Sequence, residues 1–326
     1  MTNQTSGTIR LSTDNDKTRI HEIAVAAWRP IFGRYRLIVG DEMWNDLWSG
    51  WDKNWFTNAN GIVTELDGQI VGFATWYWPI AEVLAEVGGN AVDPKFQGRG
   101  IGSAQIRWLI DKFREWGYKC AKVHTGMDPA HGPARAEYRN AGLRRGVTNS
   151  RYFNYLNEVA RVPTRSLLSF RWAESDDAEL VRQMTRSAWN SVYKSVRDTL
   201  GDEIFDITFK NAREQKTENF AKVTSDTPEK VRIVMEDEYP AGFTILDADL
   251  NKRLGEINAL AVTPEFRGRG IGCALCMDAF DIFRERGLRY TSLDANLGEV
   301  NKRTRQMCWN AGLYRELPSI DYYMML

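Results

Sequence analysis

The chain has 326 residues, and its 43 Lys and Arg balance 43 Asp and Glu, so the formal net charge is zero. This balance excludes the broad positive field with which proteins attract nucleic acid or anionic lipid, and we expect neither partner. The sequence contains no apolar run near the roughly 18 residues of a membrane span and no signal-peptide pattern, so we expect a cytoplasmic protein.

The predicted elements begin with a short strand, a polar cluster that can cap a helix, and an amphipathic helix. This helix is expected to end near Trp28, and a second amphipathic stretch follows Gly40. Two strands come next, and a third strand leads into a glycine-rich loop. The strands are expected at residues 9–11, 61–66, 70–76 and 87–92.

Beyond the loop, apolar residues at 106, 109, 110 and 113 have the spacing i, i+3, i+4, i+7, which predicts one buried face of a helix. Gly117 stands where a glycine that ends a helix belongs. Another strand, a short helix and two closing strands are expected to complete the unit.

The same order of elements then appears a second time. Residues 93–104 read DPKFQGRGIGSA and residues 263–274 read TPEFRGRGIGCA, and ten of fourteen positions agree when the copies are aligned from Ala91 and Ala261. An offset of 170 residues is too long for a solenoid and predicts two domains.

We expect these domains at residues 1–158 and 165–326, with Val159–Arg165 as the linker. The order of strands and helices predicts an α+β or α/β class for each, with a mixed, mostly antiparallel sheet flanked by helices.

Three of the four cysteines lie in the second copy, a distribution that does not suggest a disulfide framework. Cys273 and Cys276 have CxxC spacing, but no second pair and no nearby histidine accompanies them. We therefore expect two thiols packed on a helix and no bound metal.

The glycine-rich loop has the arrangement of a phosphate-binding site. Glycines let backbone N–H groups approach an anion, and the start of the following helix adds unpaired N–H groups and partial positive charge. Gln97 and Arg99, with Arg267 and Arg269 in the second copy, add donors suited to phosphate oxygens. The loop lacks the Gly-Lys-Ser/Thr of a Walker P-loop and the G-x-G-x-x-G of a dinucleotide fold.

The whole phrase Val-x-Pro-x-Phe-(Gln/Arg)-Gly-Arg-Gly-Ile-Gly resembles the acyl-CoA pyrophosphate loop of the GNAT superfamily of N-acetyltransferases. The resemblance covers nearly the whole chain, once in each copy. The tandem arrangement is similar to that of other double-GNAT enzymes. It implies acetyl-CoA as the cofactor, with its pyrophosphate on the loop and its pantetheine arm along the preceding strand. The implied cofactor-binding residues are Ala91, Val92, Gln97, Gly98, Arg99, Gly100, Ile101, Gly102 and Ser103 in the first copy, and Leu260, Ala261, Val262, Arg267, Gly268, Arg269, Gly270, Ile271, Gly272, Cys273 and Asn301 in the second.

Acetyl transfer to an amine needs a base that makes the amine neutral and an acid that returns a proton to the departing thiolate. By the same resemblance the acid is Tyr138, four residues before Gly142. The second copy has Cys308 four residues before Gly312. The first copy is therefore expected to be the catalytic one.

The base is left open among several residues. Glu86 enters the strand before the loop, where related enzymes often keep a catalytic glutamate, and a solvated strand-edge carboxylate is the alternative. Glu82 and His124 are further candidates, although a lone histidine at a strand end is more often packed or hydrogen-bonded. His131 stands where the second copy has an asparagine, at a position that in the family often contacts the cofactor near the acetyl group.

Tryptophans at positions 44, 48, 51 and 55 recur at helical spacing. A buried helix face explains this spacing, and the alternative is an aromatic-lined acceptor pocket to which Trp76 and Trp78 contribute. The second interpretation favours an apolar or aromatic-bearing amine.

These features predict an acetyl-CoA-dependent N-acetyltransferase acting on a primary amine of a small molecule. The alternatives are a non-catalytic acyl-CoA-binding sensor or scaffold, and a GNAT relative that decarboxylates malonyl-CoA. Because Arg267 and Arg269 give the second loop one more cation than the first, we also expect the second copy to bind CoA at least as tightly.

Overall fold

The computed structural model describes residues 7–53, 60–81, 83–159 and 168–326. Trp55, Glu82, the side chain of Trp78 and nearly all of the expected linker lie outside the described residues. The chain divides into two units with separate cores. Unit one comprises Met1–Val147, Thr199–Thr208 and Pro318–Leu326, and unit two comprises Thr148–Asp198 and Phe209–Leu317.

In unit one the strands follow the order β1-β2-β3-β4-β5-β12, and every neighbouring pair is antiparallel except β4 with β5. The strands are β1 (Thr8–Leu11), β2 (Asn60–Leu66), β3 (Gln69–Ala81), β4 (Leu84–Val92), β5 (Cys120–Gly126) and β12 (Arg315–Met325). The helices are α1 (Lys17–Val39), α2 (Asp41–Trp48), α3 (Ile101–Glu115), α4 (Gly132–Asn140) and α6 (Asp202–Thr208).

Unit two repeats this pattern in the order β7-β8-β9-β10-β11-β6, again with one parallel pair, β10 with β11. The strands are β7 (Leu168–Trp172), β8 (Val231–Glu236), β9 (Tyr239–Asp249), β10 (Leu254–Val262), β11 (Tyr290–Asn296) and β6 (Arg145–Tyr155). The helices are α5 (Ala178–Leu200), α7 (Ala212–Asp226), α8 (Ile271–Glu285) and α9 (Lys302–Asn310). The predicted mixed, mostly antiparallel sheet is confirmed in both units.

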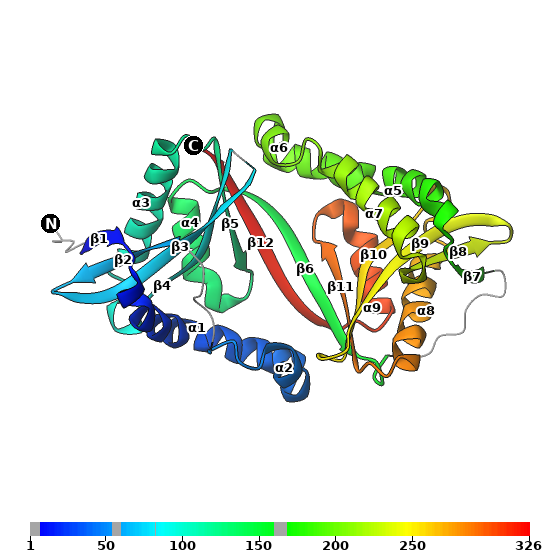
Figure 1. Cartoon of the computed structure of the whole chain (residues 1–326), viewed down its shortest axis with the longest axis horizontal. Coiled ribbons are helices and arrows are strands. Elements are labelled where there is room, and N and C mark those ends of the chain that lie inside the picture. The colour runs from blue at the N-terminus through cyan, green and yellow to red at the C-terminus, as the bar shows by residue number, and fades with distance from the viewer. Residues whose placement is uncertain (1–6, 54–59, 82, 160–167) are drawn as a thin grey trace. The chain divides into compact units, whose positions relative to one another are not determined.

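The helices of unit one cover both faces of its sheet (Figure 1). The predicted apolar stripe of α3 is confirmed, because its four residues are all buried and pack with α4 on one face. On the other face, Ile20 and Ile23 of α1 pack against Phe73 and Ala91. The α1 face and the α3 face are named by these helices below.

Each repeat ends in a long strand that belongs to the sheet of the other unit. β12, from the second repeat, pairs with β5, and β6, from the first repeat, pairs with β11 (Figure 1). Ile320 and Tyr322 of β12 are buried in the core of unit one, which makes the exchange part of the packing. The boundaries 1–158 and 165–326 therefore describe repeats along the chain, whereas each unit takes its closing strand from the other repeat.

Two expectations about element length are wrong. The first helix does not end near Trp28, because α1 continues to Val39, and its counterpart α5 in the second repeat likewise continues to Leu200. The following glycines, Gly40 and Gly201, have positive φ of 88° and 79° and end these helices there. Each repeat also closes with one long strand, where two were expected.

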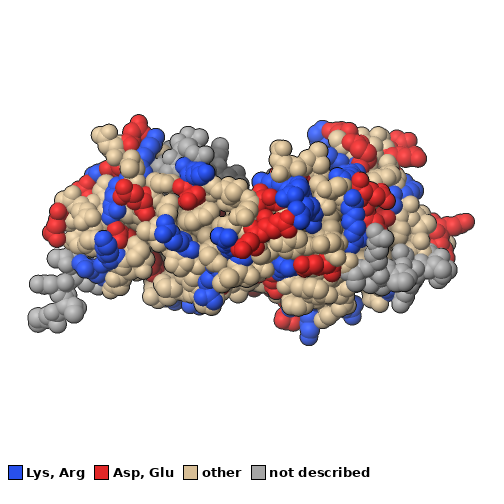
Figure 2. All heavy atoms as spheres, turned by 90° about the horizontal axis from the view of Figure 1, so that it is seen from below, with Lys and Arg blue, Asp and Glu red and all other residues tan. Residues whose placement is uncertain are grey.

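The charged side chains are distributed as the composition suggests. Figure 2 shows Lys and Arg intermixed with Asp and Glu over the face that it presents. Within the described parts of the chain, no helix is both long and apolar enough to cross a lipid bilayer.

The strand exchange predicts where a core substitution acts. Tyr322→Ala removes a ring that is 5 % exposed in unit one, at a cost of about 3 kcal/mol or more for an aromatic-to-alanine change. Hydrogen exchange measured by mass spectrometry should therefore accelerate in β4 and β5. The matched variant Tyr152→Ala, 1 % exposed in unit two, should accelerate exchange in β10 and β11. The reverse distribution would contradict the exchange of strands.

Candidate active site

The candidate site of each unit lies where its two parallel strands separate. In unit one the pairing of β4 with β5 covers Leu84–Val87, and both strands continue beyond it. In unit two the pairing of β10 with β11 covers Leu254–Ile257. Beyond these points one edge of β4 and of β10 offers backbone N–H and C=O groups to an extended, amide-bearing ligand.

A bulge accompanies each separation. Gly88 and Gly89 of β4 oppose the single residue Thr75, whose hydroxyl donates to the Gly89 carbonyl at 3.0 Å. A Cβ on Gly88 would lie 2.4 Å from the Thr75 hydroxyl oxygen, so this close approach requires glycine. Asn258 is the extra residue of β10. The two glycines that weaken a regular strand thus serve the bulge.

The glycine loops have the backbone of an anion site. Gly98 and Gly100 have φ of 76° and 80°, and Gly268 and Gly270 have 81° and 87°, in the left-handed region that favours glycine. The first intrahelical hydrogen bonds run from Ala104 to Gly100 and from Ala274 to Gly270. The N–H groups of the first three helical residues are therefore available to a pyrophosphate. These residues are Ile101, Gly102 and Ser103 in α3, and Ile271, Gly272 and Cys273 in α8.

Two loop side chains that were expected to face phosphate instead bond to the protein. Gln97 donates through Nε2 to the Val92 carbonyl at 3.1 Å, and Arg267 donates through Nε to the Val262 carbonyl at the same distance. Arg267 also donates to the carbonyl of Ala188. These bonds tie each loop to the strand before it.

The extra cation of the second loop is Arg267, where the first copy has Gln97, whereas Arg269 corresponds to Arg99. Arg269 forms an ion pair with Glu236 at 2.7 Å, and the first copy has Leu66 at the corresponding position. Arg99 lies over the ring of Phe96, 5.0 Å from its centroid. Glu236 offsets one of the two guanidinium charges of the second loop, so the number of cations no longer favours that loop. Tighter CoA binding by the second copy stays a prediction.

Tyr138 reaches the separation of the strands in unit one. It is 3 % exposed, and its hydroxyl donates to Oδ1 of Asn90, a β4 residue beyond the parallel pairing. Burial raises the pKa of Tyr138, and the neighbouring Glu137 charge adds to the shift, so the phenol is protonated at neutral pH.

Unit two lacks this hydrogen-bonded hydroxyl. Cys308 takes the place of Tyr138 and Leu260 that of Asn90. Burial raises the pKa of the Cys308 thiol to about 12, and the side chain is packed in the core of α8 and α9. The difference between Tyr138 and Cys308 that the sequence shows therefore extends to the residue that accepts the hydrogen bond from Tyr138.

Glu86 forms an ion pair with Lys122 of β5 at 3.3 Å. Lys122 also lies 3.4 Å from Asp321 of β12, and His124 Nδ1 lies 3.0 Å from the same carboxylate. Burial alone would raise the pKa of Asp321, but the hydrogen bond from His124 and the charge of Lys122 hold it below its usual value. Glu86 as the base stays a prediction.

His131 precedes α4 and hydrogen-bonds through Nδ1 to Oδ2 of Asp128. Asp128 Oδ1 accepts from the Ala130 N–H at 2.8 Å. Asn301, at the corresponding place in unit two, donates to Oδ1 of Asn296 at 3.2 Å. The two copies thus differ in chemistry at this position.

Aromatic residues of α1 and α2 form a connected group with Trp51, which follows α2. The Phe32 ring lies 5.8 Å from that of Trp44, 4.1 Å from that of Trp51 and 6.0 Å from that of Tyr35. Tyr35 in turn stacks on His131 at 6.2 Å. Packing on a buried helix face accounts for Trp44, which is 7 % exposed. Through Tyr35, the group is also in contact with His131.

Trp76 does not contribute to this group. It packs on the α3 face, 5.3 Å from the ring of Trp116, because the alternation of β3 directs its side chain there. Its expected place in an acceptor pocket is therefore wrong.

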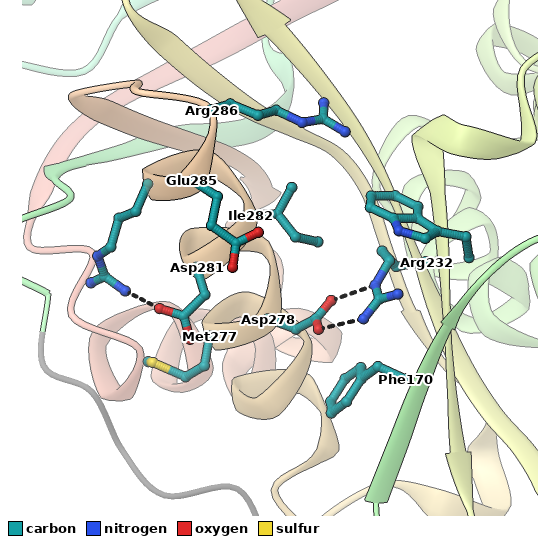
Figure 3. A pocket seen from close by; sticks show the side chains of 10 residues that line it. Phe170, Arg232, Met277, Asp278, Asp281, Ile282, Glu285 and Arg286 are labelled. Carbon is teal, nitrogen blue, oxygen red and sulfur yellow. Dashed lines mark hydrogen bonds and ion pairs between the residues drawn. The ribbon is translucent and has the colours of Figure 1, made fainter.

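A cavity of about 350 Å³ lies elsewhere, between β7, β8 and the C-terminal part of α8 (Figure 3). Arg232 and Asp278 line the cavity and form a bidentate ion pair at 2.8 Å, and Arg284 pairs with Asp281. The glycine loop precedes the opposite end of α8, so this cavity is separate from the candidate CoA site. Neither this cavity nor any other part of the described chain has three or more His, Cys, Asp or Glu side chains arranged to hold a metal.

Comparison with known proteins identifies the class. A family model described as the acetyltransferase (GNAT) family matches residues 18–143 and 189–307. The chain belongs to this family and carries its domain twice. The family uses acyl-CoA, which the free strand edges and the helix starts described above are suited to bind.

The relatives support this assignment. The chain is 28% identical over 259 residues to a mycothiol acetyltransferase of Nocardia farcinica, covering 76% of this chain and 78% of that protein. A GCN5-related N-acetyltransferase from Sphaerobacter thermophilus shares the fold, with a TM-score of 0.58 and 18% identity over 98% of this chain and 95% of its own. A tandem GNAT protein from the clavulanic acid biosynthesis pathway has a TM-score of 0.52 and 15% identity over 98% of both chains.

Sequence reasoning missed three groups that the structure brings to the site of unit one. Asn90 holds the Tyr138 hydroxyl, Asp128 holds His131, and Asp321 holds His124. Asp128 had a local signal, because an Asp that caps a turn beginning with proline can meet a side chain three residues on. Asp321 had none, since it lies 197 residues from its partner.

The burial of Glu137, which has an apolar counterpart in the second copy, leads us to expect a difference in stability between the copies. A Cβ on Gly102 would lie 2.6 Å from its carboxylate, which places this group against the start of α3. Met307 fills the same place beside Gly272 in unit two. Burial raises the pKa of Glu137, so its ionised form is disfavoured in the folded state.

Glu137→Met should therefore raise the free energy of unfolding by about 1 kcal/mol near neutral pH. The penalty in the wild type is absent below the pKa of an unfolded Glu, develops between that pKa and the raised folded pKa, and is complete above it. The gain should accordingly be smaller near about pH 4 than near about pH 7. Urea unfolding at both pH values measures this, and an equal gain at both would count against the account.

Proposed function

We propose that this protein transfers the acetyl group of acetyl-CoA to a primary amine of a small molecule, and that unit one is the catalytic unit. The observation that carries the proposal is the Tyr138 hydroxyl, held by Asn90 where β4 leaves β5 and replaced in unit two by a core thiol. A proton donor is needed there because a thiolate departs.

Bound acetyl-CoA supplies a thioester, whose C–S bond breaks as the amine nitrogen forms the C–N bond. The N–H groups at the start of α3 and the free edge of β4 orient this ligand. Tyr138 gives its proton to the departing sulfur, and its raised pKa keeps that proton in place until then. The ammonium form of the acceptor loses two protons in all, so one proton is released for each turnover.

The aromatic group of α1 and α2 supports an acceptor with an apolar or aromatic part. Phe32 and Tyr35 connect the tryptophans of α2 with His131 through ring contacts. Planar side chains of this kind favour an apolar ligand body beside a polar end. The amine would then lie at the His131 end of the group.

Unit two, in this proposal, binds CoA without turning it over. Its loop has the same left-handed glycines and the same free N–H groups as that of unit one. Ligand bound there stabilises the fold by linkage, which reaches about 2.7 kcal/mol at a hundred times the dissociation constant.

Tyr138→Phe should lower kcat by about 100-fold or more, the range of general acid catalysis, and leave the dissociation constant of acetyl-CoA nearly unchanged. Release of free thiol across a panel of amines measures the rate. Cys308→Ala, the matched change in unit two, should leave the rate within twofold. Full activity of the Phe variant sinks the assignment of Tyr138. A wild type that binds acetyl-CoA but releases no thiol with any amine is a binding module instead.

Calorimetry tests occupancy of the two loops. We expect two CoA molecules per wild-type chain and one per chain for either Gly100→Glu or Gly270→Glu. Both glycines cap their helices in the left-handed region, so the two variants carry the same backbone strain and the same misplaced charge. One molecule bound by the wild type and still one by Gly270→Glu would show that the second loop is vestigial.

A further inference from the structure

We propose that Asp128 and His131 form the acid–base pair of unit one, in which His131 Nε2 accepts a proton from the acceptor amine and Asp128 positions the ring. This inference rests on the proposed function, because it assigns a role within amine acetylation. From the sequence, His131 was expected only to contact the cofactor, and Asp128 was not identified as a candidate.

The hydrogen bond fixes the tautomer of His131. An ionised carboxylate only accepts, so the Nδ1 that faces Asp128 Oδ2 carries the ring proton. Nε2 then carries the lone pair of a base, and no partner of Nε2 is found among the described residues. The other carboxylate oxygen is held by the Ala130 N–H, so Asp128 is itself fixed.

The surroundings hold the ring in one place. Tyr35 stacks on it with an interplanar angle of 27°. A Cβ on Gly126 would lie 2.6 Å from both Cε1 and Nδ1, so the ring rests directly on the backbone at the end of β5. The side chain of His131 is 16 % exposed and that of Asp128 is 9 % exposed. A nearly buried carboxylate thus supports a ring that is partly open to a ligand.

The position relative to Tyr138 suits a paired role. His131 is the residue before α4, and Tyr138 follows seven residues later, which is close to two helical turns. His131 is itself the N-cap and contacts Tyr35 of α1, whereas Tyr138 packs with residues of the α3 face. Helical side chains lean toward the N-terminus, which directs Tyr138 toward the end where His131 stands.

Unit two has lost every member of this arrangement. Gly298 replaces Asp128 and Asn301 replaces His131, just as Cys308 replaces Tyr138. An amide has no basic lone pair at nitrogen, so Asn301 cannot accept the proton. Base and acid are therefore absent together from the copy that we infer to be inactive.

Two competing bases among the described residues of unit one, Glu86 and His124, already have partners. Glu86 is paired with Lys122, and the carboxylate beside His124 is shared with the same lysine. The side chain of His124 is 56 % exposed, so water surrounds much of its ring. His131 combines a fixed orientation with lower exposure and contact with the aromatic group.

The proton balance is complete without a further reactant. His131 takes one proton from the ammonium group, and the neutral amine then forms the new C–N bond while the C–S bond breaks. The second proton leaves the nitrogen for solvent as the amide forms, Tyr138 supplies one proton to the sulfur, and the proton held by His131 then passes to Tyr138. After proton return to Tyr138 and loss of one proton to solvent, both residues are restored.

The experiment compares one substitution at all three histidines of the chain, His21, His124 and His131. His131→Asn, which introduces the residue of unit two, should lower kcat/KM for the amine by about 100-fold or more and abolish the acid limb of its pH profile. The affinity for acetyl-CoA should not change.

Among the described residues, the charged and titratable groups around the ring are Asp128, Tyr35 and Arg135, whose guanidinium binds the carbonyls of Gly126 and Asp128.

Asp128→Asn keeps an acceptor for the Ala130 N–H but presents an amide to the ring. We expect kcat to fall and the nitrogen NMR signals of His131 to lose the Nδ1-protonated pattern, a readout that a merely structural role would not move. His21→Asn, on α1 away from these contacts, should leave both rate and pH profile unchanged.

Three results would overturn the proposal, and they are distinguishable. If the wild type acetylates an amine and His131→Asn keeps the rate and the acid limb, the pair is wrong while the proposed function stands. If His124→Asn removes the acid limb instead, the base is His124. If the wild type acetylates no amine, both the function and the pair fail.

Discussion

The separation of two parallel strands is the constraint on which both units depend. β4 and β5 pair over Leu84–Val87 only, and the bulge at Gly88 and Gly89 turns the rest of β4 away. This single irregularity frees a strand edge for the amides of the ligand and brings the glycine loop to the start of α3. Asn90, which accepts the hydrogen bond from the Tyr138 hydroxyl, lies on the part of β4 that no longer pairs with β5. β10 and β11 repeat the separation, so the frame for an acyl-CoA was kept twice.

What differs between the units is the chemistry placed on this frame. The backbone features agree in φ, helix start and strand register, and these are the features suited to an acyl-CoA ligand. The side chains of the proposed active site diverge, and they change as a set that includes Tyr138, Asn90, Asp128 and His131. The strand exchange adds a dependence between the repeats, because β12 supplies both core residues and Asp321 to unit one. Neither repeat alone contains all of either unit.

The sequence was sufficient for whatever is local. The repeated glycine phrase, the stripe of α3 and the strand pattern predict the family, the fold class and the backbone of both loops. It was not sufficient where the outcome depends on distant partners. No local pattern shows that β12 pairs with β5, that Glu236 neutralises Arg269, or that Trp76 turns toward α3. The aspartate beside His131 was within reach of a local rule, since only three residues separate them.

The central claim is that one frame catalyses while the other only binds. It is tested most directly by the rate of acetyl transfer in chains whose loops are blocked one at a time, measured at saturating acetyl-CoA. The account predicts that Gly270→Glu keeps nearly the whole wild-type kcat and that Gly100→Glu loses it. Loss of activity in Gly270→Glu, with Gly100→Glu still active, would place the chemistry in unit two and contradict the account.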